Sequence, residues 1–454
     1  MPLDLAALAR RAAEFGGEEA IASVSHRREL VVECGPDGAL RPPRLRDEVW
    51  LRLLIRDAGG RLGMVQRGGP FDDASLAVAA EQARHQASGG HLDLRPFAMP
   101  QPGPEHVGFD EATARLDPVS ATATARATAA SIEFALGRGR SASWRGESVA
   151  FAVARSGGGQ ATDARTAAKL IARATDDDGL LTGYAESAAT DASLLDASEV
   201  GLRASPPLAP VLLRAAPQLF RGDACAVLLE PAALAPLLRA LAGAACTGLS
   251  HATGTSPYTG RVGLPVAPAT VTLLDAPSDP GTLPRSIDVE GTPASAVALI
   301  DAGRAGGVLH DTASAAEFGA ASTGHAAALG GAPLAAAARN LVLLPAGERR
   351  IGLELAAECD GPVVRVSRID QVQTAGPVAT RFRAIGRAAS LVEGGATVAL
   401  LGDVVLAGDV AAVLADVLAV GGDSQLIARL NRLPERTTAT ACPPLLTCGL
   451  ELVA

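Results

Sequence analysis

The residues able to perform chemistry are few, and none of them falls into a catalytic pattern. A zinc hydrolase needs two histidines on one face of a helix and a nearby carboxylate that takes the proton from the metal-bound water. The chain has seven histidines, but it contains neither HExxH nor HExxxH. It also lacks GxSxG, GxxxxGKS and any Cys-His pair with a recognisable local signature. The sequence therefore predicts no catalytic residue and no metal ligand in this chain.

The six cysteines are scattered and form no CxxC pair. Cys442 and Cys448, separated by five residues near the C-terminus, have no histidine close to them in the sequence. Lone cysteines of this kind are more often structural than metal-binding. We therefore expect free thiols in apolar surroundings, as is usual in a reducing compartment.

Composition narrows the class of protein. A length of 454 residues is typical of two domains of roughly 200 residues each. The net charge of -9 argues against a nucleic-acid-binding protein, because such proteins need a basic face to displace counterions from phosphates. The chain has no apolar stretch of about 20 residues, and it meets Asp4, Arg10 and Arg11 before any run long enough for a signal peptide. We therefore expect a cytoplasmic protein that binds neither nucleic acid nor membrane.

The hydrophobic patterns of the N-terminal half predict helices and long strands. Residues 20–34 alternate with period two. The alternation from Val49 to Ile55 is followed by Gly59-Gly60 and RLGMVQR, which predicts a β-hairpin. The other predicted elements are helices at 4–15, 74–87, 117–136 and 192–203 and strands at 143–154 and 162–174. Because Pro206-Pro207 interrupts the pattern, we expect a mixed α/β domain at 1–205.

The C-terminal half, residues 206–454, is predicted to form a domain rich in strands. A strand from Ala224 to Leu229 leads into a helix that begins at Glu230-Pro231, where a proline at the first helical position loses no hydrogen bond. The buried stripe of this helix comprises Leu234, Leu237, Leu238 and Leu241. Further strands are predicted near 341–344, 351–356, 362–367, 396–400 and 403–406, and a last helix between Asp409 and Gly421. Because no regular βαβ rhythm exists, the predicted class is α+β.

Seven segments in a fixed order span nearly the whole length of the chain. The N-terminal segments are the hairpin ending in RLGMVQR, SWRGESVAFAVA and DDDGLLTGYAES. The C-terminal segments are IDVEGTP (287–293), GVLHDTASAAEFGAASTGHA (307–326), ARNLVLLPAGE (338–348) and VALLGDVVLAGDVAAVLADVLAVGGD (398–423). This ordered set resembles the TldD/PmbA family, also called TldD/TldE. The resemblance implies the two-domain α+β architecture of that family, with a metallopeptidase-like C-terminal domain.

The resemblance also implies a division of labour between two subunits. In TldD-type subunits the helix after a Val-Leu-Leu strand carries HExxxH, and a cysteine near the C-terminus supplies a third zinc ligand. The PmbA/TldE-type subunit lacks the motif and completes the peptide-binding cavity. In this chain Glu230, Pro231 and Ala235 stand at the three motif positions. Because proline and alanine neither bind zinc nor accept a proton, the chain resembles the PmbA/TldE type.

From this resemblance we expect a heterodimer with a TldD-like subunit that carries HExxxH. Zinc is expected in that partner and no cofactor in this chain. The pair is expected to hydrolyse a small peptide or amide. Departures from the family pattern, such as Ala313 for a tyrosine and Val289 for an acid, favour one specialised substrate, as in the maturation of a peptide-derived antibiotic.

Two alternatives stay open. The chain could be a homodimeric hydrolase whose metal site is assembled from dispersed groups such as His310, His325, Asp311 or the late cysteines. The other alternative is a stand-alone protein that binds a peptide or small amide without a partner. A neighbouring gene for an HExxxH-bearing relative would favour the heterodimer.

The residues expected to bind the substrate or the partner lie in two segments: Ser322, Thr323, Gly324, His325, Asp288 and Glu290. The first four stand among small residues and could offer hydrogen bonds to an extended peptide, as in strand addition. A loop histidine bonded to its own backbone is the simpler interpretation of His325. The two acids could orient a substrate amine or anchor a neighbouring loop, and a solvated turn is an equally good interpretation.

Overall fold

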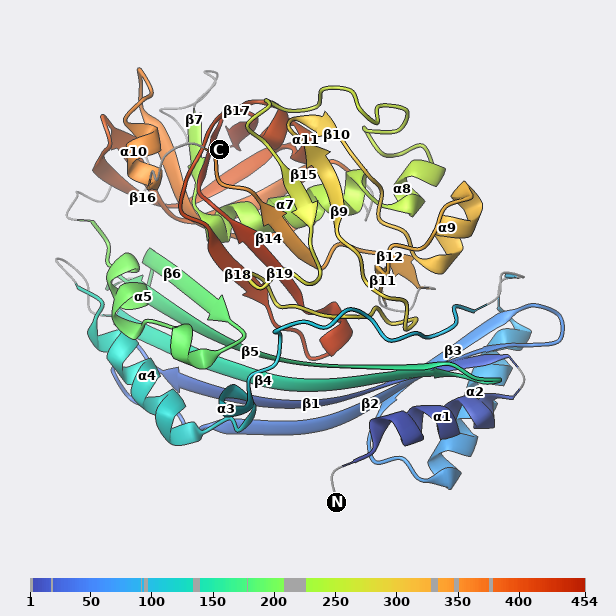
Figure 1. Cartoon of the computed structure of the whole chain (residues 1–454). Coiled ribbons are helices and arrows are strands. Elements are labelled where there is room, and N and C mark those ends of the chain that lie inside the picture. The colour runs from blue at the N-terminus through green and yellow to red at the C-terminus, as the bar shows by residue number, and fades with distance from the viewer. Residues whose placement is uncertain are drawn as a thin grey trace.

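The computed structural model shows a broad curved sheet with helices on its outer face and a strand-rich second half packed on its inner face (Figure 1). It describes residues 3–453 apart from 18, 91, 94–96, 134–138, 178, 208–225, 328–333, 347–350 and 375–378. Helices and strands are mixed, which confirms the predicted α+β class and the β-rich C-terminal half. The division at residue 205 stays a prediction, since much of the segment that follows it lies outside the described residues.

The N-terminal sheet is antiparallel throughout and has the order β3-β2-β1-β4-β5-β6. Its strands are β1 (Ala20–Cys34), β2 (Arg44–Arg56), β3 (Leu62–Gly68), β4 (Gly139–Arg155), β5 (Gln160–Thr175) and β6 (Leu181–Ala189). The first predicted strand is confirmed at both ends, and the predicted hairpin is β2 with β3. Strands this long leave side chains alternating between two faces, so the sheet needs cover on both.

Helices cover the outer face of this sheet (Figure 1). They are α1 (Leu5–Gly16), α2 (Asp73–Ser88), α3 (Glu111–Ala114), α4 (Pro118–Ala130) and α5 (Ala197–Arg203), with a 3₁₀ turn η1 (Ala192–Leu194). Asp4, Asp72 and Asp117 cap the first three long helices through their side chains. The helix predicted at 192–203 is split into η1 and α5. The helix predicted at 117–136 is α4, which ends at Ala130. Alanine and leucine fill the core between helices and sheet, which leaves the inner face for the second half.

The second half consists of two sheets with a long helix between them. The seven-stranded sheet has the order β17-β20-β7-β14-β15-β16-β21, and the six-stranded sheet has the order β10-β9-β8-β13-β19-β18. The first comprises β7 (Ala226–Leu229), β14 (Val363–Thr374), β15 (Arg381–Glu393), β16 (Ala396–Asp409), β17 (Val417–Val420), β20 (Leu445–Thr447) and β21 (Leu450–Val453). The second comprises β8 (Leu273–Asp275), β9 (Val297–Asp301), β10 (Arg304–Ala305), β13 (Asn340–Leu343), β18 (Gln425–Arg429) and β19 (Thr438–Cys442). Helix α7 (Pro231–Ala245) buries its leucine stripe in the core that both sheets share, as predicted.

Short elements complete the second half. They are α8 (Gly248–Ala252), α9 (Thr312–Phe318), α10 (Gly352–Ala356), α11 (Val410–Ala415), the pair β11 (Ala326–Ala327) and β12 (Ala335–Ala336), and the 3₁₀ turn η2 (Pro434–Arg436). The strand predicted at 351–356 is wrong, because this segment forms α10. The reason is local: Glu354 accepts a hydrogen bond from the Ile351 backbone N–H at 3.0 Å and so caps a first helical turn.

The predicted last helix is too long. It ends at Ala415, and the residues from Val417 form β17, because they pair with β20 instead of continuing the helix. The strands predicted at 396–400 and 403–406 are one strand, β16, in which Gly402 has φ 70° and the pairing with β15 shifts in register. A bulge of this kind bends a strand without ending it.

Buried polar contacts hold the two halves together. Arg52 of β2 forms an ion pair with Glu435 of η2, and both side chains are buried. Nearby, the Arg165 guanidinium donates to the Pro434 carbonyl at 2.6 Å. On the surface, Arg432 adds an ion pair with Glu48 at 2.8 Å. Among the described residues, no helix is long and apolar enough to cross a membrane.

Candidate functional site

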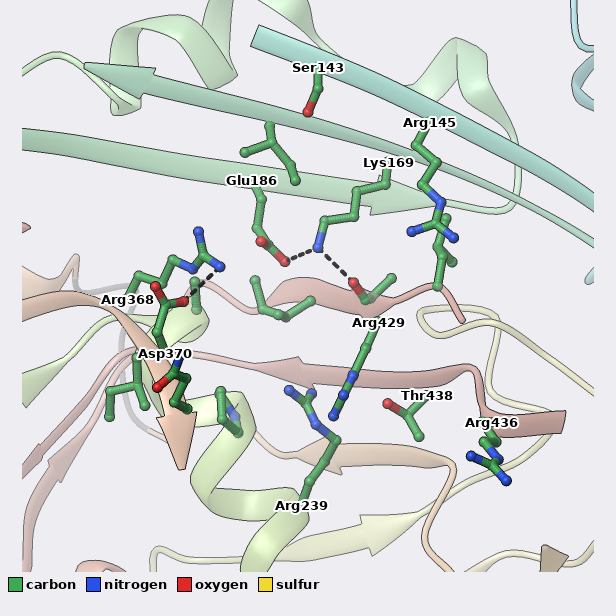
Figure 2. Close-up of a pocket in the computed structure, with 18 of the residues that line it drawn as sticks. Ser143, Arg145, Lys169, Glu186, Arg239, Arg368, Asp370, Arg429, Arg436 and Thr438 are labelled. Atoms are coloured by element: carbon green, nitrogen blue, oxygen red, sulfur yellow. Dashed lines mark hydrogen bonds and ion pairs between the residues drawn. The ribbon is translucent and has the colours of Figure 1, made fainter. Parts of the chain in front are cut away.

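A cavity of about 980 Å³ lies between the two halves of the chain. One wall is the inner face of the N-terminal sheet, from which Lys169 and Glu186 project (Figure 2). The facing wall is built by α7, β14 and β18, which contribute Arg239, Arg368 and Arg429 (Figure 2). This volume is at the upper end of what small-molecule sites occupy, and it suits a short peptide.

The cavity is cationic although the chain as a whole is acidic. Eight arginine and lysine side chains line it against four carboxylates, so the wall carries a surplus of four positive charges. The carboxylates are Glu29, Glu33, Glu186 and Asp370. Because a cleft with low-dielectric walls focuses the field of its charges, such a surplus attracts anions.

Most of these cations already have an acidic partner. Lys169 Nζ donates to Glu186 Oε1 at 2.8 Å and to the Ala428 carbonyl at 2.7 Å, and Tyr184 also donates its hydroxyl to Glu186. Burial acts to raise the pKa of Glu186, but the charge of Lys169, the hydrogen bonds from Lys169 and Tyr184 and the charge of Arg368 together outweigh it, and the pKa is lowered. Glu186 therefore stays ionised at neutral pH, and the pair ties β5 and β6 to β18.

The other ion pairs on the wall follow the same principle. Arg368 lies 2.7 Å from Asp370 on β14. Arg145 pairs with Glu29, which also binds the buried Arg27. Burial acts to raise the pKa of Glu29, but hydrogen bonding by Arg27 and the nearby arginines lower it.

Arg239 and Arg429 are different, because no carboxylate within the described residues pairs with either. Arg239 projects from the middle of α7 and donates to Thr440 Oγ1 at 3.1 Å. Arg429 ends β18 and is exposed to the cavity. Figure 2 shows the two guanidinium groups beside each other. Burial lowers the pKa of Arg239 to about 10, and the like charge of Arg429 contributes to the lowering.

The beginning of α7 carries the three positions that the family resemblance singles out. Glu230 precedes the helix and accepts from Arg365 Nε at 2.6 Å, so an ion pair engages its carboxylate. Pro231 and Ala235 are buried, and Ala235 is packed in the shared core. Neither side chain has an atom that can ligate a metal or carry a proton.

Cys442 lies next to the first turn of this helix. Its Sγ is 3.6 Å from the Pro231 carbonyl, and the side chain is fully buried. Burial raises the pKa of the thiol to about 12, so the thiol is protonated at neutral pH in this structure. Cys448 is only half-buried and belongs to the turn before β21. In the part of the chain that the structure describes, no three His, Cys, Asp or Glu side chains gather into a group that could hold a metal ion.

The two predicted acids are buried and anchor neighbouring loops. Asp288 Oδ2 accepts from the Ala326 backbone N–H at 2.9 Å. Glu290 Oε2 accepts from the backbone N–H and the hydroxyl of Thr312 at 3.1 and 2.7 Å. Burial and the charge of Asp288 raise the pKa of Glu290 to about 8, and burial also raises the pKa of Asp288. Whether either acid contacts a substrate or partner stays a prediction.

The predicted Ser-Thr-Gly-His segment lies against the same loops. Thr323 Oγ1 accepts from the His310 backbone N–H at 2.8 Å, and the Ser322 hydroxyl donates to the His310 carbonyl at 3.3 Å. Gly324 has φ 69°, and a Cβ there would lie 2.3 Å from the Pro293 carbonyl oxygen, so glycine is required. Ser322 and Thr323 are half-buried, which leaves part of each accessible.

His325 is fully buried in this segment. Its Nδ1 lies 2.9 Å from the Thr323 carbonyl, as the simpler interpretation of this histidine expects. Its Nε2 lies 3.4 Å from Asp275 Oδ1. Burial acts to raise the pKa of Asp275, but His325 opposes it and the pKa is lowered. The structure therefore brings all the predicted site residues into one cluster of loops joined by hydrogen bonds. None of these residues lines the cationic cavity.

The sequence analysis missed the residues of the cationic wall. Lys169, Arg239 and Arg429 come from strands and a helix far apart in the chain, and only folding brings them together. One signal was present: Arg239 is the single charged residue in the helix PAALAPLLRALAGAA. A lone arginine in an otherwise apolar helix needs a polar environment, which the cavity provides.

Comparison with known proteins places this fold and site in a class of metallopeptidase-related chains. A family model described as the PmbA/TldA metallopeptidase C-terminal domain matches residues 222–453. The chain therefore belongs to the PmbA/TldD family. No curated protein matches the sequence.

Three solved structures share the fold over essentially the whole chain. TldE from Thermococcus kodakarensis is 19% identical, with a TM-score of 0.76 and 99% of each chain covered. A proposed modulator of a DNA gyrase from Thermotoga maritima is 18% identical, with a TM-score of 0.74 and coverage of 99% of this chain and 98% of that one. Another proposed modulator of DNA gyrase, from Bacteroides thetaiotaomicron, is 18% identical, with a TM-score of 0.74 and complete coverage of both chains.

Proposed function

We propose that this chain is the non-catalytic, PmbA/TldE-type subunit of a heterodimeric zinc peptidase. In this proposal a TldD-like partner carries HExxxH and the zinc, and this chain shapes the cleft in which a small peptide or amide is hydrolysed. The observation that carries the proposal is the state of α7. The helix forms one wall of a large cavity, yet Glu230, Pro231 and Ala235 occupy its motif positions.

The chemistry of these positions supports a pseudoenzyme. Zinc in hydrolases takes three protein ligands and an activated water. Pro231 and Ala235 offer no donor atom, and Arg365 already binds the Glu230 carboxylate. Cys442, which lies next to the first turn of this helix, is a buried neutral thiol. We infer that zinc, where it is present in the complex, belongs to the partner.

The edge of β14 supports a peptide as the substrate. This strand pairs with β7 only as far as Val366 but continues along the cavity to Thr374. Beyond Val366, no described strand pairs with this edge of β14. Backbone donors and acceptors on such an edge bind an extended peptide by adding it as a strand, whatever its side chains.

The loop cluster supports a role in contacting the partner or the substrate. Residues 316–321, which precede Ser322, are exposed and include Phe318 with 46% of its surface accessible. Asp288, Glu290 and His325 fix the loops on either side of this exposed segment. We propose that Ser322 and Thr323 make the contacts and that the buried acids and histidine hold them in place.

A specialised substrate is part of the same proposal. Val289 and Ala313 stand where the family pattern has an acid and a tyrosine, and both positions flank the loop cluster. The loss of these polar groups is consistent with one dedicated peptide or amide, as in the maturation of a peptide-derived antibiotic in the cytoplasm.

Co-expression tests the proposal. The chain is purified alone and together with an HExxxH-bearing relative from the same genome, and mass, zinc content and hydrolysis of a short-peptide library are measured. We expect a stable one-to-one complex in which zinc and activity appear only with the partner. As a control, replacing the glutamate of the partner's HExxxH by glutamine should abolish turnover and leave the complex intact. Stoichiometric zinc and turnover in this chain alone would refute the proposal.

A stand-alone binding protein is the second candidate. The observation that favours it is that residues of this one chain suffice to line the cavity. The same experiment separates the two candidates, because a binding protein would form no complex with the HExxxH-bearing relative.

A further inference from the structure

The cavity contains two adjacent guanidinium groups with no acid between them. Arg239 comes from the helix and Arg429 from the edge strand of the six-stranded sheet. In the described part of the chain, the polar partner of Arg239 is a neutral hydroxyl, Thr440 Oγ1 at 3.1 Å. Figure 2 places the guanidinium of Arg429 directly beside that of Arg239.

This arrangement is unfavourable when the cavity holds only water. Like charges at short distance repel each other, and the repulsion grows as burial removes solvent screening. The pKa of Arg239 records the cost, because burial and then Arg429 lower it to about 10. An anion between the two groups would turn repulsion into two attractions.

The remaining cations of the wall do not compete for such an anion to the same degree. Glu186 neutralises Lys169, and Asp370 neutralises Arg368. No described carboxylate pairs with Arg239 or Arg429, and the two guanidinium groups lie side by side, so the anion site has a defined place on the wall. Glu186 and Asp370 also disfavour a highly charged ligand, since they would repel it.

We propose that Arg239 and Arg429 bind a carboxylate of the peptide substrate, so that the substrate of the complex is an acidic peptide or one held by its C-terminus. Arginine forks match the two oxygens of a planar carboxylate, and charge-assisted bonds of this kind are about twice as strong as neutral ones. The apolar side chains of Pro236, Ala240 and Ile427 line the cavity around this pair and lower the dielectric constant there. The substrate assignment rests on the proposed function, whereas carboxylate binding by the chain does not.

Calorimetric titration of the full chain tests the site with defined probes. The probes are acetyl-Ala-Glu-Ala-Ala-amide, which has only a side-chain carboxylate, and acetyl-Ala-Gln-Ala-Ala, which has only a C-terminal one. The neutral acetyl-Ala-Gln-Ala-Ala-amide and inorganic phosphate complete the set. We expect one or both of the first two probes to bind and to weaken with salt, because the Debye length is only about 10 Å at 0.1 M. The better of these two identifies the source of the carboxylate.

Three variants locate the binding site. Arg429→Gln and Arg239→Gln should each weaken the carboxylate probe by about 10-fold to 100-fold, the range for losing a charged hydrogen bond. Arg10→Gln, on the exposed side of α1, is the matched control and should leave the affinity unchanged. Thermal unfolding checks that each variant folds, and Arg239→Gln should not lower the midpoint, since the charge it removes is repelled by Arg429.

Each result has a clear meaning. Weaker binding in both cavity variants and unchanged binding in the control support the site. Equal binding of the neutral amide, tighter binding of phosphate, no binding of either carboxylate probe, or unchanged affinity in both variants would overturn it. Because the chain is titrated alone, the two tests are independent. Failure to find a zinc-bearing partner would refute the proposed function but not carboxylate binding by the chain. Failure of the chain to bind a carboxylate would refute the site but not the proposed function.

Discussion

Replacing Glu290 by glutamine should make the stability of this protein less dependent on pH. Burial and the neighbouring Asp288 raise the pKa of Glu290 from its ordinary value of 4.5 to about 8 in the folded chain. The folded state therefore keeps a proton that the unfolded chain releases at a much lower pH. Because the folded state binds more protons, the free energy of unfolding falls as the pH rises between these two values.

The size of the effect follows from the shift. Each pKa unit corresponds to about 1.4 kcal/mol, so a shift from 4.5 to about 8 sets an upper limit of roughly 5 kcal/mol. Glutamine resembles the protonated acid and keeps an oxygen that accepts the two hydrogen bonds from Thr312. Glu290→Gln should thus be close to the native chain in stability at pH 5 and clearly more stable at pH 9.

Urea denaturation at several pH values between 5 and 9 measures this difference. Subtracting the native curve from the variant curve cancels the titrating groups that do not interact with Glu290, and the difference then contains Glu290 together with the neighbouring Asp288. Glu317→Gln is a matched control, because this glutamate is exposed on the same helix that Glu290 anchors, and its difference curve should be flat. A flat difference curve for Glu290→Gln as well would show that the acid is ionised in the folded chain, and the argument from burial would be wrong.

Three further substitutions test other parts of the structure. His325→Ala should lower the free energy of unfolding by about 1–3 kcal/mol, because it leaves the buried Asp275 without its 3.4 Å partner, and an unchanged denaturation midpoint would contradict this. Cys442 should not react with a thiol reagent at pH 8 until the protein unfolds, and Cys442→Ala should leave the zinc content of the complex unchanged. Arg52→Ala should destabilise the chain by about 3–5 kcal/mol, because it removes the cation that pairs with the buried Glu435 carboxylate and leaves only the neutral hydrogen bond from Gln66 in its place, and a loss below about 1 kcal/mol would show that solvent reaches the pair.

The N-terminal half is predictable from the sequence because its signals are local and long. Residues 20–34 alternate over fifteen positions, and the structure has a strand with the same ends. One face of this strand carries Ala20, Ala22, Val24, Leu30, Val32 and Cys34, so the period of two is visible without knowledge of the partner strands, although His26 and Arg28 interrupt it. Helix caps are similarly local, as Asp4 and Asp409 illustrate.

The C-terminal half is less predictable because tertiary contacts define its elements. Strands such as β8 and β20 have three residues each, too few for any period to be recognised. The segment at 351–356 has an alternating pattern but forms a helix, since one glutamate side chain decides its first turn. Residues from Val417 have helical spacing yet form a strand, because β20 offers a pairing edge.

The candidate site likewise has features that the sequence shows and features that only the folded chain shows. The loss of the zinc motif is visible in the sequence, since it concerns three positions within one short segment, Glu230 to Ala235. The burial of Asp288 and Glu290 is not, because charged residues are seldom buried and the sequence does not show the backbone groups that receive them. The pairing of Arg239 with Arg429 joins residues 190 positions apart, which no local pattern can indicate.

Under the proposed function, the cationic cavity indicates what a subunit without catalytic residues would contribute to the complex. A helix that served only to pack would gain stability from an apolar residue at position 239, because the present guanidinium is half-buried beside a like charge. Residues that break such local rules without a compensating contact are expected at functional sites. Helix α7 therefore combines two opposite features. Pro231 and Ala235 stand at positions where the family motif has a zinc-binding or proton-accepting side chain, and the energetically unfavourable charge of Arg239 lies one to two turns further along the helix. The proposed function, in which this chain recognises the substrate and the partner cleaves it, accounts for both features of the helix.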